Sequence, residues 1–95
     1  MDFGHAIRRL RKEHYMTQGQ LAELCFVSKT TVSAWENDRT FPPKGSAERL
    51  CKAFGIPVAY FILEGIEEQD VPEKHRDVFL TLLKPMRNFL LEKEP

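Results

Sequence analysis

Two helix-start signals that follow each other closely constrain the fold of this chain more than any other feature. Thr17 and Gln20 form a capping box, in which the threonine hydroxyl accepts from the Gln20 amide and the Gln20 side chain reaches back to the Thr17 amide. Ser28 is a second favourable N-cap residue. Because only about three residues, 26–28, separate the two helices, the sequence predicts a pair of short helices joined by a tight turn.

The remaining segments also carry helical patterns, and none alternates convincingly enough to be a strand. Asp2 can cap a first helix. Ser46 can start a fourth helix that ends at Gly55, where a left-handed residue is favoured, and Pro57 can start a short fifth helix. The sequence therefore predicts an all-α fold with five helices in residues 1–65.

The inward faces of these helices supply one modest core. Its largest candidates are Trp35, Phe54 and Phe61, which we expect to fill the core rather than to bind a ligand. The second helix is expected to contribute Leu21, Ala22, Leu24 and Cys25. With 42% hydrophobic and 29% charged residues, the chain has the composition of an ordinary folded domain.

Residues 66–95 form a predicted C-terminal helical extension. Asp70, with Glu73 three residues on, is expected to start its helix, and Pro85 predicts either a kinked helix or two short ones. The apolar face of this extension either folds back on the five helices or meets its twin in a homodimer. We expect dimerisation, because five short helices rarely need this much extra apolar surface. The predicted dimerisation residues are Phe79, Leu82, Leu83, Met86, Phe89 and Leu90.

The formal net charge is zero, but the charge is unevenly spread. Residues 1–52 carry nine basic and six acidic side chains, whereas residues 53–95 carry five basic and eight acidic ones. The first half is therefore the only candidate for a surface that faces phosphate groups.

Two helices joined by so tight a turn, the second with short polar residues outward, suit reading of the DNA major groove. The sequence also resembles the phage-repressor and Cro type of helix-turn-helix regulators, the XRE family. The resemblance is carried by IRRLRKEHYMTQGQLAEL, VSKTTVSAWENDRTFPP and LCKAFGIPVAYFI, and it covers roughly residues 3–65. It implies a five-helix, lambda-repressor-like domain that binds double-stranded DNA.

The resemblance also implies roles for particular residues. Lys29, Thr30 and Ser33 would face base edges from the recognition helix, at about residues 29–37. The implied DNA-binding set is completed by Thr17, Gln18, Ser28, Asn37 and Arg39, mostly at the phosphate backbone. Arg11 would pair with Glu36, and we interpret this ion pair as structural.

The chain departs from the family pattern at three turn positions where the family favours glycine: Tyr15, Phe26 and Asp38. A left-handed conformation costs an aromatic residue about 1 kcal/mol or more. We therefore expect a slightly reshaped turn between the second and third helices.

The favoured function is a DNA-binding transcriptional regulator, most simply a repressor. Two other hypotheses stay open: an antitoxin whose tail holds a toxin, and a protein-interaction module that no longer binds DNA. An enzyme is not expected, since no Ser/His/Asp or Cys/His arrangement and no phosphate-binding glycine loop is evident.

No cofactor or metal is expected either. Cys25 and Cys51 fall on apolar helical positions and are expected to be buried free thiols, and the three histidines lack metal-ligand spacing. No apolar stretch approaches the roughly 20 residues that span a bilayer, and the first residues do not resemble a signal peptide. We therefore expect a cytoplasmic protein without a membrane partner.

Overall fold

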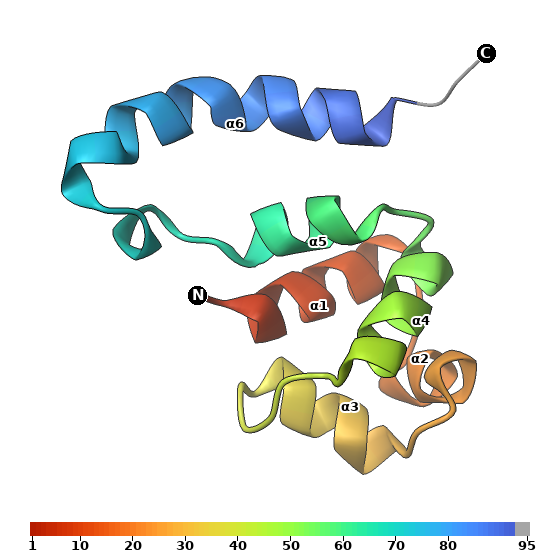
Figure 1. Ribbon diagram of the computed structural model, residues 1–95. Helices are drawn as coiled ribbons and strands as arrows, with labels where there is room; N and C mark the ends of the chain where they lie inside the picture. The colour runs from red at the N-terminus through yellow and green to blue at the C-terminus, as the bar shows by residue number, and fades with distance from the viewer. Residues whose placement is uncertain (93–95) are drawn as a thin grey trace.

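The computed structural model describes residues 1–92, and these residues contain helices and no strands (Figure 1). The helices are α1 (Phe3–Glu13), α2 (Gln18–Cys25), α3 (Lys29–Glu36), α4 (Lys44–Phe54), α5 (Val58–Gly65) and α6 (Arg76–Leu91), with 3-10 turns at Glu68–Asp70 and Glu73–His75. This architecture confirms the predicted all-α class, five helices followed by a C-terminal helical extension. None of the helices in the described residues is long and apolar enough to cross a membrane.

The three predicted N-caps near the start of the chain are all present. The Asp2 carboxylate accepts from the His5 amide at 3.0 Å, and the Ser28 hydroxyl accepts from the Thr31 amide at 3.1 Å. The capping box is complete: the Gln20 amide donates to Thr17 Oγ1 at 3.1 Å, and the Thr17 amide donates to Gln20 Oε1 at 2.8 Å. Local side-chain chemistry therefore fixes where α1, α2 and α3 begin.

The predicted starts of α4 and α6 were wrong. Helix α4 begins at Lys44, with Pro43 in an extended conformation as its N-cap, and Ser46 is buried inside the helix. Helix α6 begins at Arg76 rather than just after Asp70. The Asp70 carboxylate accepts instead from the Glu67 amide at 2.8 Å and from the Met1 ammonium at 2.9 Å, and Asp70 is the last residue of a short 3-10 turn whose N-cap is Glu67.

The core lies where α1 to α5 meet. Trp35, Phe54 and Phe61 are buried as predicted. They pack in one cluster with Phe3, Ile7, Leu10, Leu21, Ala22, Cys25, Val32, Leu50 and Cys51. Leu24, predicted to face inward, is 51% exposed, because α2 turns it toward solvent while Leu21 and Cys25 face the core. Cys25 and Cys51 are buried free thiols, as expected.

Close backbone packing fixes α1 against the end of α3. A Cβ atom on Gly4 would lie 2.6 Å from the Trp35 carbonyl oxygen and 2.7 Å from that of Glu36. The Gly4 amide also donates to the Asp38 carboxylate at 3.0 Å. Only glycine fits where the two helices approach so closely.

The three positions where the family favours glycine all adopt left-handed conformations. The φ angles are 55° at Tyr15, 57° at Phe26 and 56° at Asp38. The two aromatic side chains are 94% and 81% exposed, respectively, so they point into solvent while the backbone keeps the turn conformation. The expected reshaping of the turn is therefore not needed, although strain of about 1 kcal/mol remains at each aromatic residue.

Helix α6 lies beside α5, at the end of the molecule opposite α3 (Figure 1). Of the two outcomes expected at Pro85, the structure has a single helix that runs through the proline. The predicted dimerisation residues divide into two groups. Phe79, Leu83 and Leu90 are half-buried, whereas Leu82, Met86 and Phe89 remain exposed.

A buried carboxylate in α5 connects α6 to the rest of the fold. Glu64, whose side chain is 3% exposed, is paired with Arg9 of α1, and its Oε1 lies 3.3 Å from Nε of Arg87 in α6. Burial opposes ionisation of Glu64, but hydrogen bonds from Arg9 and Tyr60 outweigh it and lower the pKa of this carboxyl group. Sequence analysis did not identify this cluster.

Candidate nucleic-acid interface

The first residues of α3 present a polar surface that the rest of the molecule leaves open. Lys29 and Thr30 are exposed, and neither side chain makes a hydrogen bond or an ion pair within the described residues. Ser33 and Asn37 follow at positions that share this side of a helix. Because α6 lies at the far end of the molecule, this helix does not cover the surface (Figure 1).

The hydroxyl groups of the predicted set also have local structural roles. Ser28 caps α3 and its Oγ lies 2.9 Å from Thr31 Oγ1, and Thr17 caps α2. Each cap leaves further backbone amides of the first helical turn without an intrahelical partner. The N-terminal ends of α2 and α3 therefore both offer amide donors and the positive end of a helix dipole to an anion.

Gln18 connects the two helices of the candidate interface. Its Nε2 donates to Glu36 Oε1 at 3.1 Å, so the first residue of α2 bonds to the last residue of α3. The Gln18 side chain is half-buried. This contact holds the relative positions of α2 and α3, which decide where Lys29 and Thr30 point.

The predicted ion pair is present behind α3. Arg11 Nε lies 2.6 Å from Glu36 Oε2, Arg11 Nη2 lies 3.0 Å from Oε1, and the Glu36 side chain has no exposed surface. Arg11 also donates to the Met16 carbonyl at 2.9 Å, which ties the turn between α1 and α2 to the same cluster. A buried carboxylate with this many donors is held in one position.

The Glu36 carboxylate stays ionised despite its burial. Burial raises the pKa of this carboxyl group, but hydrogen bonds from Arg11 and Gln18 outweigh that effect, so its pKa lies below the ordinary value. Arg8, whose Nε lies 3.4 Å from Glu36 Oε1, adds to the same effect. Sequence analysis missed Arg8, although its position three residues before Arg11 on the same helix was the available signal.

The end of α3 carries the last two predicted residues. Asn37 donates to the Ser33 carbonyl at 2.8 Å and to Ser33 Oγ at 3.3 Å, so in this structure its amide closes the helix end. Arg39 is exposed just beyond the helix. Asp38, between them, is turned away, with its carboxylate on the Gly4 amide. The Arg39 side chain is therefore exposed at the end of α3, while the carboxylate of Asp38 is directed toward α1.

Within residues 1–92, no group of three or more His, Cys, Asp or Glu side chains is arranged to hold a metal ion. The polar side chains of the surface are alcohols, amides and single cations, which suit hydrogen bonding to base edges and phosphate oxygens.

Fold and surface together define a helix-turn-helix protein: two capped helices, a left-handed turn between them, and an open polar side on the second. The Helix-turn-helix family model matches residues 7–61, and the chain belongs to this family, within its phage-repressor or XRE type. The match runs from Ile7 within α1 to the middle of α5 and leaves α6 outside.

Curated relatives are similar over the same part of the chain. The HTH-type transcriptional activator BcrR of Enterococcus faecalis is 34% identical over 58 residues, which cover 61% of this chain and 28% of that protein. The competence pilus inhibition repressor of Acinetobacter baylyi is 40% identical over 63 residues, or 66% of this chain and 57% of that protein. The matched part of this chain thus spans about a quarter of the length of the first relative and somewhat over half of the length of the second.

A solved structure extends the likeness to the whole fold. The crystal structure of the clp gene regulator ClgR from Corynebacterium glutamicum superposes with a TM-score of 0.67 over 90% of this chain and 92% of that chain, at 24% sequence identity. At this identity the likeness concerns the fold. A match of this length extends beyond the family domain into α6.

Proposed function

We propose that this protein is a DNA-binding transcriptional regulator that places α3 in the major groove of double-stranded DNA. The observation that carries the proposal is the open polar surface at the start of α3, held in place by the Gln18–Glu36–Arg11 cluster. An α-helix fits the major groove, where each base pair presents a distinct pattern of donors and acceptors. Membership of the helix-turn-helix family supports the same function.

Three side chains of α3 would read bases. Lys29 would donate to guanine O6 and N7, and Thr30 would offer its hydroxyl or methyl group to a base edge. Ser33, one turn further on, would use the hydroxyl hydrogen that its bond to Asn37 leaves free. Ala34 lies beside Ser33 and has no polar group, so sequence selection would also depend on DNA shape.

The remaining candidates would bind the phosphate backbone on either side of the groove. Thr17 and Gln18 at the start of α2, and Ser28 at the start of α3, would present backbone amides and polar side chains to phosphate oxygens. Asn37 and Arg39 would contact a phosphate beyond the end of α3. These contacts would fix the register of the helix on the duplex without reading sequence.

The regulator would act as a repressor and as a homodimer. One of the curated relatives described above is named as a repressor, which supports the first part. The exposed apolar residues Leu82, Met86 and Phe89 of α6 support the second. Two subunits related by a twofold axis would span half-sites about 10 base pairs apart. Occupation of such a site would block other proteins from the same DNA.

The test is selection of bound duplexes from a randomised pool, followed by affinity measurements at several salt concentrations. We expect enrichment of one short palindromic sequence, and affinity that falls steeply with salt because phosphate contacts release counterions. Lys29→Ala should weaken binding to the selected site by about 1–3 kcal/mol and relax the preference at one base pair. Arg39→Ala should weaken binding to all sequences alike and reduce the salt slope by about 1.

Lys84→Ala is the matched control for Lys29→Ala, because it removes the same charge from exposed α6, at the opposite end of the molecule. It should leave affinity and sequence preference unchanged. Enrichment of no sequence by the wild-type protein, or equal effects of the two lysine substitutions, would contradict the proposed function.

A further inference from the structure

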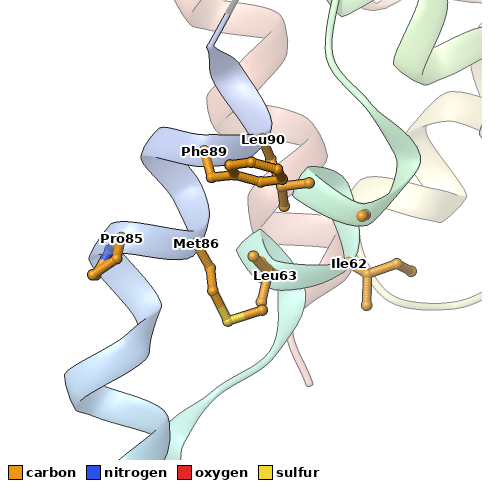
Figure 2. A pocket seen from close by; sticks show the side chains of 7 residues that line it. Ile62, Leu63, Pro85, Met86, Phe89 and Leu90 are labelled. Atoms are coloured by element: carbon orange, nitrogen blue, oxygen red, sulfur yellow. The ribbon is translucent and has the colours of Figure 1, made fainter.

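Exposed apolar side chains gather at a second place besides the α5–α6 groove. Figure 2 shows that groove, whose apolar residues belong to the surface that supports the proposed homodimer. The second place lies on α2 and on the turns at both of its ends, away from α6 (Figure 1). The function proposed above gives it no role.

This α2 surface consists of Tyr15, Leu24 and Phe26, which are 94%, 51% and 81% exposed. Two open grooves make it continuous. The first has a volume of about 480 Å³ and is lined by Tyr15, Met16, Gln20, Glu23 and Leu24. The second has a volume of about 470 Å³ and is lined by Leu24, Phe26, Arg49, Lys52 and Ala53. Because Leu24 lines both grooves, the two recesses adjoin at this side chain.

Folding does not explain the two aromatic residues of the α2 surface. Tyr15 and Phe26 have φ angles of 55° and 57°, in the left-handed region that glycine adopts without strain. Burial of a large apolar side chain can offset such strain, but both of these side chains remain in solvent. Residues held in unfavourable backbone conformations cluster at functional sites. The two exposed aromatic residues, one in each groove, therefore indicate a surface that binds apolar groups.

The second groove also carries positive charge. Arg49 and Lys52 of α4 are both exposed, and neither takes part in an ion pair within residues 1–92. The guanidinium carbon of Arg49 lies 5.3 Å from the centre of the Phe26 ring, which is a cation–π contact. This contact places the guanidinium donors beside the apolar recess, where they can bind a carboxylate. In the first groove the charged lining residue is Glu23, so the positive charge lies at one end of the α2 surface.

We propose that the α2 surface binds an acidic segment of another protein. Bulky apolar side chains of the segment occupy the two grooves on either side of Leu24, and its carboxylates pair with Arg49 and Lys52. With about 150–200 Å² for a whole large apolar side chain, the three residues of the surface expose on the order of 400 Å². A standard interface between folded proteins buries about 800 Å² per partner. The area therefore suits a single segment, and the two cations select an acidic one.

The α2 surface adjoins the candidate nucleic-acid interface but shares no residue with it. Phe26 comes shortly before Ser28, the cap of α3, whereas Leu24 and the two cations belong to α2 and α4. A segment bound here would therefore lie next to the duplex rather than in place of it. This consequence rests on the proposed function, but binding of the segment itself does not.

Selection from a displayed library of random peptides tests the proposal without DNA. The wild-type chain is the target. Peptides that bind the double variant Leu24→Ala/Phe26→Gly are removed first, which discards those that bind the α5–α6 groove. We expect the remaining peptides to carry bulky apolar residues close to Asp or Glu. Replacement of these acids by Asn and Gln in a synthetic peptide should raise its dissociation constant, measured by fluorescence anisotropy, by at least about tenfold.

Matched variants assign the binding to the α2 surface. Leu24→Ala should raise the dissociation constant of the selected peptide at least about fivefold. Leu80→Ala is the control, because Leu80 of α6 is 47% exposed and lies outside both grooves, and it should leave the constant within about twofold. Phe26→Gly relieves backbone strain, so its urea midpoint should be no lower than that of the wild type, while its affinity for the peptide falls about tenfold. A purely structural role of Phe26 would not give this combination.

The two cations distinguish a protein segment from DNA as the occupant. The double variant Arg49→Gln/Lys52→Gln should weaken binding of the selected peptide and leave affinity for the selected duplex unchanged. The reverse result would assign both cations to phosphate groups and would overturn the proposal. Enrichment of no peptide after the subtraction, equal effects at Leu24 and Leu80, or unchanged binding of the peptide without its acids would overturn it as well. Peptide binding by a chain that selects no duplex would leave this proposal standing, so it and the proposed function can fail separately.

Discussion

Replacement of Glu36 by glutamine tests whether the cluster behind α3 is structural. Glutamine keeps the size of the side chain but removes its charge. The Glu36 side chain has no exposed surface and the Arg11 side chain is only 11% exposed, so water cannot replace the lost carboxylate. Arg8 and Gln18 also lose the carboxylate as an acceptor. The substitution therefore leaves a buried guanidinium group without its counter-ion.

The expected effect is large compared with the stability of a small domain. Removal of one partner from a buried ion pair destabilises a protein by about 3–5 kcal/mol, and domains unfold with a free energy of about 5–15 kcal/mol. Because 1 kcal/mol shifts the melting temperature of a domain this size by about 4–8 °C, Glu36→Gln should melt at least about 12 °C below the wild type. For a domain of only about 5 kcal/mol, a loss of about 5 kcal/mol would leave roughly half of the molecules unfolded at about 25 °C.

Thermal and urea unfolding followed by circular dichroism measure this loss directly. Glu23→Gln is the control, because it makes the same change on the exposed side of α2 and should stay within about 0.5 kcal/mol of the wild type. Arg11→Met and the double variant complete a cycle that isolates the interaction between the two residues. A Glu36→Gln protein with the wild-type melting temperature but without DNA binding would refute this reasoning, because it would place the carboxylate in the DNA site.

Three further predictions concern other parts of the chain. Glu36 and Glu64 have folded-state pKa values below those of the unfolded chain, so their stabilisation is present above the ordinary glutamate pKa and is lost as pH falls through the folded values. The free energy of unfolding, measured with urea, should therefore decrease below about pH 4.5. It should decrease less steeply in Glu64→Gln than in the wild type. An equal acid dependence in that variant would contradict this role of Glu64. Tyr15→Gly should raise the free energy of unfolding by about 0.5–1 kcal/mol, because it relieves a left-handed aromatic residue whose side chain is 94% exposed; a lower urea midpoint would count against it. Burial raises the pKa of the Cys51 thiol to about 11, so thiol reagents at pH 8 should label it only after unfolding, and rapid labelling of the native protein would disprove its burial.

Features that depend on neighbouring residues in the chain could be predicted from the sequence. The caps at Asp2, Thr17 and Ser28 each join residues three apart, so their spacing alone identifies them. The left-handed conformations at Tyr15 and Phe26 occur where the family favours glycine, although the residue types led us to expect a slightly reshaped turn between α2 and α3. The placement of Lys29 and Thr30 at the start of α3 follows from the same caps, while their contact with DNA stays a prediction.

Features that depend on distant residues could not be predicted. Asp70 is a residue type that often caps helices, but the Met1 ammonium binds its carboxylate, and α6 begins only at Arg76. Glu64 lies in a stretch that reads only as the end of a helix, and its partners Arg9 and Arg87 come from opposite ends of the chain. The division of the α6 face into a covered and an exposed stripe likewise depends on where α5 lies, which periodicity alone does not give.

The placement of Glu64 has a consequence for any attempt to isolate the DNA-binding part of this protein. The boundary predicted at residue 65 coincides with the end of α5, but an ion pair crosses it. Arg87, after the boundary, neutralises the carboxylate of Glu64, before it. A fragment that ends at Gly65 would keep Glu64 with Arg9 and Tyr60 but without Arg87, and it would lose the acids that hold the Met1 ammonium. Measurements on such a fragment would therefore report a perturbed molecule. Any factor that pulls α6 away would act on α1, the helix whose Arg11 is paired with Glu36 of α3.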